Sequence, residues 1–135
     1  LIGNVTYSME QRQGDGRDNP QYLDCSAFTA WAFHKAGITS VAYSSTTATF
    51  IASGKFVDIE AKDLRPGDIG LKSSTAATGG ANHVGIYCGQ MKNGTKVYLH
   101  CTPSSGTSLT GNDSGVMFGA YTNFTYFRRL KKWNK

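Results

Sequence analysis

The 135-residue sequence lacks several features that define well-known structural classes. Its three cysteines are an odd number and include no Cys-x-x-Cys pair, which argues against a disulfide framework and against a typical zinc site. No apolar run approaches the length of a membrane span, and no charged-then-apolar leader precedes the domain. No internal repeat or linker divides the chain. We therefore expect one domain over residues 1–135, without metal or cofactor, and its abrupt start at Leu1 suggests excision from a larger protein.

Charge is also scarce, at 17% of residues, and the net charge of +5 comes mainly from one end. A nucleic-acid-binding sheet would interleave basic and aromatic residues across a face, whereas here they gather in "FRRLKKWNK", so we expect no nucleic-acid partner. Such a tail could instead attract anionic lipid or an acidic cell-wall polymer, or it could be a solvated end that keeps the protein in solution. The basic residues concerned are Arg128, Arg129, Lys131, Lys132 and Lys135.

The order of secondary-structure signals indicates the fold class. Residues 1–12 predict a short helix or an extended segment, and 13–21 a loop rich in Gly, Asp and Asn. Helical patterns come early, and β-branched, aromatic or alternating patterns follow. We therefore predict an α+β fold with an antiparallel sheet of about five to six strands. The expected helices cover 25–36 and 45–53, and the expected strands 55–60, 64–72, 83–89, 96–101, 115–121 and 124–130.

A cysteine opens the first predicted helix. Asp24 is a good N-cap residue, which places Cys25 at the first helical position, and Gly37 can end the helix. The positive end of the helix dipole favours a thiolate at this position, whereas most free cysteines are small buried hydrophobes. Apolar residues at helical spacing predict one buried face, made of Ala27, Phe28, Trp31, Ala32 and Ala36.

Two of the three histidines lie on a predicted hairpin. "HVGIYCG" and "KVYLHC" flank an Asn-Gly turn signal, and a turn centred between Met91 and Lys92 sets His83 opposite His100. Directly opposed residues share a face, with Cβ atoms roughly 5 Å apart. We expect that face to pack on the cysteine helix, although a slip of one residue would separate the two rings.

The remaining cysteines and histidine have simpler interpretations. Cys88 and Cys101 would share the other face of the hairpin, too far apart for a disulfide, and are expected to fill the core. His34 lies three turns from the start of the helix, so it cannot reach Cys25 along the same helix. We expect it to be a partly exposed helix residue.

A thiolate at a helix start needs a general base, and the base needs a partner that fixes its tautomer and orientation. Cys25, His83 and His100 could fill the three roles of nucleophile, base and orienting residue, in that order. The backbone amide of Cys25, free at the helix start, could donate to the oxyanion of a tetrahedral intermediate.

These residues and their surroundings resemble the NlpC-type (NlpC/p60 superfamily) cysteine peptidases that cut bacterial peptidoglycan. The matching stretches are "DCSAF", "LRPGDIG", "HVGIYCG" and "YLHC", in the family's order from about Tyr7 to Cys101. "VTYSMEQR" and the His-Cys pair further resemble a branch of phage lysins classed as amidases. The resemblance implies a papain-like fold with a catalytic set made of Cys25, His83 and His100, and it suggests substrate-binding or oxyanion roles for Tyr7, Asp24 and Ser26.

The sequence departs from the family pattern in two places. Ala27 replaces the glycine usual after Asp-Cys-Ser and is expected to narrow the groove, and the long loop "SSTAATGGAN" is expected to shape access to the site. For Asp68 we expect a structural role, in which its carboxylate caps its own Pro-Gly turn.

The resemblance implies an enzyme that hydrolyses an amide of peptidoglycan, secreted to the cell wall or carried as a phage lysin or virion-associated protein. The scissile bond would be either the muramoyl–L-alanine amide or the bond from D-glutamate to the diamino acid. The resemblance to phage lysins slightly favours the first. Two rivals remain, a cell-wall-binding module without turnover and a thiol acyltransferase on the same scaffold.

Overall fold

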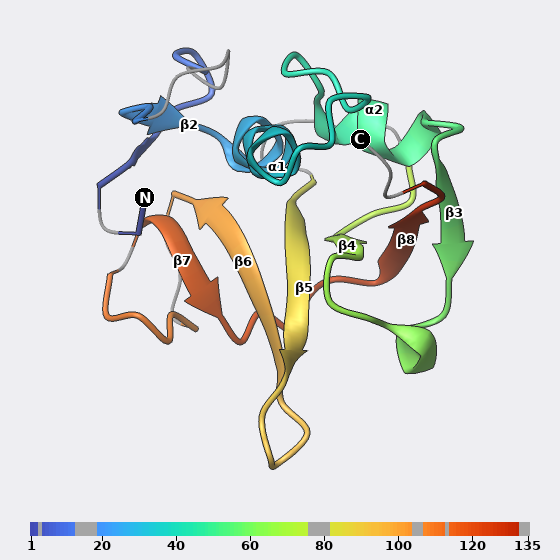
Figure 1. Cartoon of the computed structure of the whole chain (residues 1–135). Coiled ribbons are helices and arrows are strands. Elements are labelled where there is room, and N and C mark those ends of the chain that lie inside the picture. The colour runs from blue at the N-terminus through green and yellow to red at the C-terminus, as the bar shows by residue number, and fades with distance from the viewer. Residues whose placement is uncertain (3, 13–18, 76–81, 104–106, 113, 133–135) are drawn as a thin grey trace.

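The computed structural model describes residues 1–2, 4–12, 19–75, 82–103, 107–112 and 114–132. Figure 1 shows two helices lying along one side of a strongly twisted sheet, with α1 (Cys25–Lys35) above its centre and α2 (Thr47–Ala52) beside it. A short 3-10 helix, Ala61–Asp63, follows the first strand of the sheet. Within the described residues, neither helix has the length and apolar character needed to cross a membrane.

Six strands form an antiparallel sheet in the order β3-β8-β4-β5-β6-β7, which confirms the predicted α+β class and strand number. All six predicted strand segments are present. At the N-terminus the chain is extended rather than helical, and β1 pairs in parallel with β2. The strands are β1 (Thr6–Tyr7), β2 (Tyr22–Leu23), β3 (Phe56–Ile59), β4 (Ile69–Leu71), β5 (Val84–Gln90), β6 (Lys96–Thr102), β7 (Gly115–Gly119) and β8 (Tyr126–Leu130).

Local sequence determines where α1 begins and ends. The Oδ1 atom of Asp24 accepts a hydrogen bond of 2.7 Å from the backbone N–H of Ala27, which confirms the predicted N-cap. Gly37, with a φ of 86°, takes the left-handed conformation just beyond the helix end. These two residues fix Cys25 as the first residue of α1 and set its orientation.

The predicted apolar face of α1 packs into the core except at Ala36, but the prediction missed a second buried side, because the helix lies between two parts of the core. One side of α1, which includes Ala30 and Phe33, packs with residues of α2, β3, β4, β5 and β8. The other side, which includes Ala27 and Phe28, packs with β2, β6 and β7. Ala36 lies past the helix end and is exposed. The apolar spacing in the sequence identified the side with Ala27 and Phe28, but not the side with Ala30.

The two arginines of the predicted basic tail are built into the sheet. Arg128, on β8, is buried, and its guanidinium binds the Asp58 carboxylate at 2.9 Å together with four backbone carbonyl oxygens of the α2–β3 region. It therefore cannot serve as the expected contact for a wall polymer. Arg129 pairs with Asp68 at 2.9 Å. Asp68 also accepts the backbone N–H of Arg65 at 2.8 Å, which confirms its expected turn-capping role.

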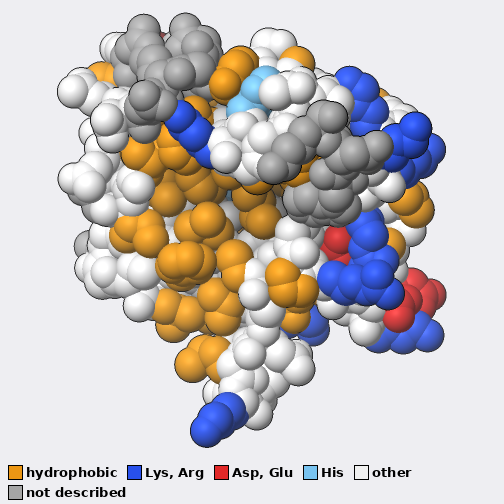
Figure 2. Space-filling view, viewed as in Figure 1, with side chains coloured by type: hydrophobic (Ala, Val, Ile, Leu, Met, Phe, Trp, Pro, Cys, Tyr) orange, Lys and Arg blue, Asp and Glu red, His pale blue; other side chains and the backbone are white. Residues whose placement is uncertain are grey.

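Lys131 and Lys132 remain exposed, whereas Lys135 lies outside the described residues. In Figure 2, Lys and Arg side chains gather on the right of the molecule, where β3 and β8 lie in Figure 1, while apolar side chains cover much of the left and centre. Most of the Lys and Arg side chains of the visible face therefore lie on that side, and others lie at the upper left and at the bottom of the molecule.

Candidate active site

Cys25 is held in an environment that favours the neutral thiol. Its side chain is buried, and this burial is the main cause that raises the Cys25 pKa to about 11, with a further contribution from the charge of Asp24. The backbone N–H groups of Val84, Ser26 and Cys25 itself act in the opposite direction. Desolvation of the buried sulfur therefore opposes the helix start, which favours a thiolate, and the balance of the two raises the Cys25 pKa.

The two histidines predicted as a pair are in direct contact. The Nε2 atom of His83 lies 2.7 Å from the Nδ1 atom of His100, and both side chains are buried. The ring planes are inclined by 67°, with centroids 5.0 Å apart. One imidazole therefore donates to the other, which fixes both ring orientations.

The predicted register that opposes these histidines directly is wrong by two residues. The ladder pairs Ile86 with Leu99 and Tyr87 with Tyr98, and this register continues to set His83 opposite Thr102. A bulge at Cys88, which shifts the register between Tyr87 and Gly89, and a turn spanning Met91–Thr95 account for the offset. Because the offset is an even number, the histidines stay on one face as diagonal neighbours.

The expected packing of the histidine face against α1 is also wrong. The residues that join α1 in the core, Val84 and Cys101, alternate with the histidines and so project from the other face. His83 nevertheless comes immediately before Val84, at the start of β5, and the Val84 N–H interacts with the Cys25 sulfur. The first turn of α1 and the start of β5 thus meet at one end of the sheet, where the Cys25 sulfur lies against the backbone of Val84, the residue after His83.

Aromatic side chains surround the histidine pair. Phe124 stacks on His83 with centroids 5.6 Å apart and an interplanar angle of 6°, and Tyr121 contacts both imidazoles, with centroids at 5.3 and 5.6 Å. Burial, followed by the charges of His100 and Lys72, lowers the pKa of His83 to about 3. Burial lowers the pKa of His100 to about 4. Both imidazoles are consequently neutral at pH 7.

His100 has one nitrogen without a partner. Its Nε2 atom is buried and forms no hydrogen bond with any described residue. Gly119 of β7 lies against this atom so closely that a Cβ added at the glycine would be 2.8 Å from it. For His83 to accept a proton at Nδ1, its own proton must be on Nε2, which then donates to Nδ1 of His100. The proton of the neutral His100 ring must in that case be on its unpartnered Nε2 atom. The contact with Gly119 therefore bears directly on the tautomer of the pair.

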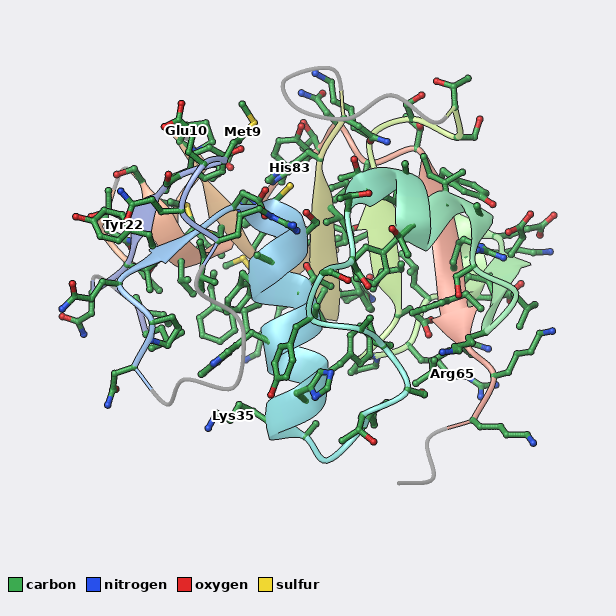
Figure 3. The ribbon with its side chains drawn as sticks, turned by 90° about the horizontal axis from the view of Figure 1, so that it is seen from above. Met9, Glu10, Tyr22, Lys35, Arg65 and His83 are labelled. Atoms are coloured by element: carbon green, nitrogen blue, oxygen red, sulfur yellow. The ribbon has the colours of Figure 1, made fainter. Side chains whose placement is uncertain are left out.

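A pocket of about 330 Å³ opens beside the start of α1. Figure 3 places Met9 and His83 at this end of α1, with Lys35 at the opposite end. The pocket is lined by residues of the N-terminal segment, of the start of α1 and of the start of α2. Its lining consists of Tyr7, Met9, Arg12, Asp24, Cys25, Ser26, Thr46 and Thr47.

The resemblance gave expectations for three residues of the pocket lining, for Ala27 and for one loop. Tyr7, Asp24 and Ser26 all line it, and burial, followed by the charges of Cys25 and Asp24, raises the pKa of Tyr7 to about 12. Ala27 does not narrow the groove, because its methyl group is buried in the core. Of the loop expected to shape access, residues 76–81 lie outside the described residues.

The remaining sequence expectations concern residues away from the pocket. Cys101 fills the core as expected, whereas Cys88 is only half-buried at the bulge. His34 is half-buried, and its imidazole stacks on Tyr43 with centroids 3.7 Å apart. It therefore belongs to the far end of α1, in agreement with its expected structural role.

Arg12 is a site residue that the sequence did not reveal. Its Nε atom donates to Asp24 Oδ2 at 2.9 Å, and its Nη2 atom donates to the hydroxyl of Ser26 at 3.1 Å and to the carbonyl oxygen of Ser45. The Ser26 hydroxyl in turn donates to Asp24 Oδ1 at 3.1 Å. A lone arginine in a polar segment follows no periodic pattern, so nothing in the sequence connects it with the helix start.

A buried cysteine at a helix start, beside histidines on an antiparallel sheet, defines a papain-like α+β fold. The sequence model of the NlpC/P60 family matches residues 10–125, and the chain belongs to this family. It is similar to the peptidoglycan DL-endopeptidase CwlO of Bacillus licheniformis, with 37% identity over 109 residues. The alignment covers 81% of this chain and 22% of that protein, so the chain spans about a fifth of the relative's length.

Proposed function

We propose that the protein hydrolyses an amide bond of peptidoglycan, with Cys25 as nucleophile, His83 as general base and His100 as orienting residue. The observation that carries this proposal is a helix-start cysteine that lines an open pocket and lies against the backbone of Val84, next to His83, whose imidazole is hydrogen-bonded to that of His100. Family membership and the similarity to a peptidoglycan endopeptidase support it.

The reaction starts from a neutral thiol and a neutral imidazole, which agrees with the raised pKa of Cys25 and the lowered pKa of His83. The sulfur attacks the amide carbonyl carbon while its proton moves to Nδ1 of His83. Charge develops on the carbonyl oxygen, where the backbone N–H of Cys25 and the hydroxyl of Tyr7 are the candidate donors.

Collapse of the tetrahedral intermediate breaks the C–N bond, and the leaving amine takes the proton from His83. A thioester remains on Cys25. A water molecule then gives a proton to the same imidazole and attacks the thioester carbon, which releases a carboxylate product and restores the thiol. His100 accepts the Nε2–H of His83 throughout and holds the ring in the tautomer that this sequence needs.

Within this reaction class, the relative supports a bond in the stem peptide, because its name describes a DL-endopeptidase. We propose the bond from D-glutamate to the diamino acid. The alternative, the N-acetylmuramoyl–L-alanine amide, is supported by the resemblance of "VTYSMEQR" to phage-lysin amidases. Both bonds can be cut by the same three residues.

The decisive experiment is mass spectrometry of the soluble fragments released from purified peptidoglycan. Wild type is compared with Cys25→Ala, and Cys88→Ala, which alters a half-buried cysteine on the hairpin, serves as the matched control. Release by wild type and Cys88→Ala but not by Cys25→Ala supports the proposal. New diamino-acid N-termini identify the endopeptidase, and new L-alanine N-termini identify the amidase.

The same assay separates the rival functions. Binding to walls of several chemotypes without any fragment release would leave a non-catalytic wall-binding module. Products joined to an added amine in preference to water would indicate a thiol acyltransferase. A hydrolase of this class acts at the cell wall, as a secreted or a phage-borne protein, and the exposed Lys131 and Lys132 would add a weak attraction to anionic wall polymers.

A further inference from the structure

The connection from β7 to β8 crosses the face of the sheet that carries the histidine pair. β6, β5 and β4 separate these two strands in the sheet, so residues 120–125 pass over the strands between them. The ring of Phe124 fixes this passage, because a Cβ added at Gly70 of β4 or at Gly85 of β5 would lie 2.9 or 3.0 Å from its atoms. The two glycines therefore make room for the ring that stacks on His83.

Tyr121, near the start of this connection, covers both imidazoles at once. Its ring centroid lies 5.3 Å from that of His83, 5.6 Å from that of His100 and 4.5 Å from that of Phe124. The two histidines are only 9% and 0% exposed, and Phe124, which also contacts both of them, is buried. Tyr121 is only half-buried, so it is the part of this aromatic cover that reaches solvent.

The solvent side of the cover is a second pocket, with a volume of about 320 Å³. The rings of Tyr121 and Phe124 line this pocket and also contact His83, so they lie between the pocket and the imidazoles. Removal of the Tyr121 ring would open the histidine pair to the pocket. The full lining is Gly94, Thr95, Lys96, Tyr98, Ala120, Tyr121, Thr122 and Phe124.

Few charges act on the histidine pair, and burial has the larger effect. The charges that act on His83 belong to His100 on β6 and to Lys72, the residue after β4. Cys25, at the start of α1, acts on the Tyr121 hydroxyl. For both imidazoles burial is the largest cause of the lowered pKa. The neutral state of the pair therefore depends mainly on the side chains that cover it.

We propose that Tyr121 is a positioning residue of the hydrolase, whose ring keeps solvent away from the His83–His100 pair and so keeps His83 available as a base in mildly acidic solution. A solvated imidazole takes up a proton near pH 6.5, and a protonated His83 could not accept the proton of Cys25. The inference rests on the proposed function for the role of His83. It does not depend on which amide bond is cut.

The test compares initial rates of wall digestion at pH 8 and pH 5, at wall concentrations far below saturation, in wild type, Tyr121→Phe and Tyr121→Ala. We expect the ratio of the rate at pH 8 to that at pH 5 to be at least about threefold larger in Tyr121→Ala than in wild type. Tyr121→Phe keeps the ring and should keep the wild-type ratio. A merely structural role would lower both rates alike and leave the ratio unchanged.

Tyr43→Ala is the matched control. Tyr43 is also half-buried and also stacks on a histidine, His34, with centroids 3.7 Å apart, but it lies at the far end of α1. Its ratio of rates should equal that of wild type, and circular dichroism at pH 5 shows that each variant is folded. An unchanged ratio in folded Tyr121→Ala, or an equal increase in Tyr43→Ala, would overturn the inference.

An NMR titration of the imidazole C–H signals in the wild-type protein tests the cover without any variant or substrate. We expect neither His83 nor His100 to titrate between pH 8 and pH 5, and His83→Gln assigns the His83 signal. A midpoint for His83 above about pH 5.5 would overturn the inference even if Tyr121→Ala does not fold. These results remove the inference alone if wild type digests walls. If wild type digests no wall at either pH, the proposed function itself fails.

Discussion

At the scale of single residues, the tertiary environment decides the protonation states of the site. The helix start lowers the pKa of a cysteine by an effect that sequence can anticipate, but burial of Cys25 is a property of the folded molecule. The same holds for His83 and His100, because burial is the largest cause of their lowered pKa values. The helix-start position of Cys25 and the contact of the two histidines could therefore be predicted from the sequence, whereas the charges of these side chains could not.

Alkylation of Cys25 tests the resting state directly. The pKa of about 11 predicts that the rate of iodoacetamide labelling rises steadily from pH 7 to pH 10, since only the thiolate reacts. Peptide mapping by mass spectrometry assigns the label to Cys25 and separates it from Cys88. A plateau in rate already at pH 7 would show a preformed thiolate–imidazolium pair and contradict this assignment.

Gly119 lies against the imidazole of His100. In Gly119→Ala the new methyl group would lie 2.8 Å from Nε2, so the imidazole must move and the 2.7 Å bond to His83 must lengthen. We expect wall hydrolysis to fall by at least about tenfold, with a loss of about 1–3 kcal/mol in the free energy of unfolding. Gly54→Ala is the control, because its Cβ would contact nothing within 4 Å. Unchanged activity in Gly119→Ala would exclude an orienting role for this His–His contact.

At the scale of elements, alternating, β-branched and aromatic patterns together with turn signals identify every strand of the main sheet, but they do not determine how two strands are paired. The bulge at Cys88 adds a residue to one side of the hairpin, and the neighbouring Gly89, with a φ of 129°, is a sequence signal that the predicted register did not use. Arg12 escaped notice for a related reason, since its partners Asp24 and Ser45 lie 12 and 33 residues away in the chain. Long-range polar contacts of this kind form only when the chain folds, and no local sequence pattern predicts them.

The interior position of Arg128 gives a prediction for β8. Arg128→Ala removes the donors of four backbone carbonyl oxygens that lie between α2 and β3. We expect the free energy of unfolding to fall by about 3 kcal/mol, because several of these acceptors would be left buried without partners. Denaturant unfolding measures this change. Lys132→Ala, at an exposed site, should stay within about 0.5 kcal/mol of wild type, and an equal effect of both changes would place Arg128 in the solvated tail after all.

At the scale of the whole molecule, the buried histidine pair makes stability depend on pH. The pKa values of His83 and His100 are lowered in the native state from 6.5 to about 3 and about 4, so below pH 6.5 the unfolded chain binds protons that the native state does not. Their contribution to stability is complete above pH 6.5 and is lost as the pH falls. Each histidine should cost about 2 kcal/mol between pH 8 and pH 5.

Guanidinium unfolding at pH 8 and pH 5 checks this expectation. In His83→Gln the part of the pH-dependent loss that belongs to His83 should disappear, so the difference between the two pH values should shrink by about 2 kcal/mol. A difference as large as that of wild type would mean that His83 is not the group that titrates. Carboxylates contribute equally to both proteins and cancel in the comparison.

The turn of the β5–β6 hairpin has a practical consequence of its own. Figure 1 shows this turn projecting beyond the lower edge of the sheet, whereas β5 begins, next to His83, at the opposite edge beneath the helices. Residues 91–94 are exposed, and at Gly94, with a φ of 87°, an added Cβ would contact nothing within 4 Å. A cargo, dye or solid support attached at Lys92 would therefore leave the pocket facing outwards, so the hairpin offers a handle for immobilising the domain in a defined orientation.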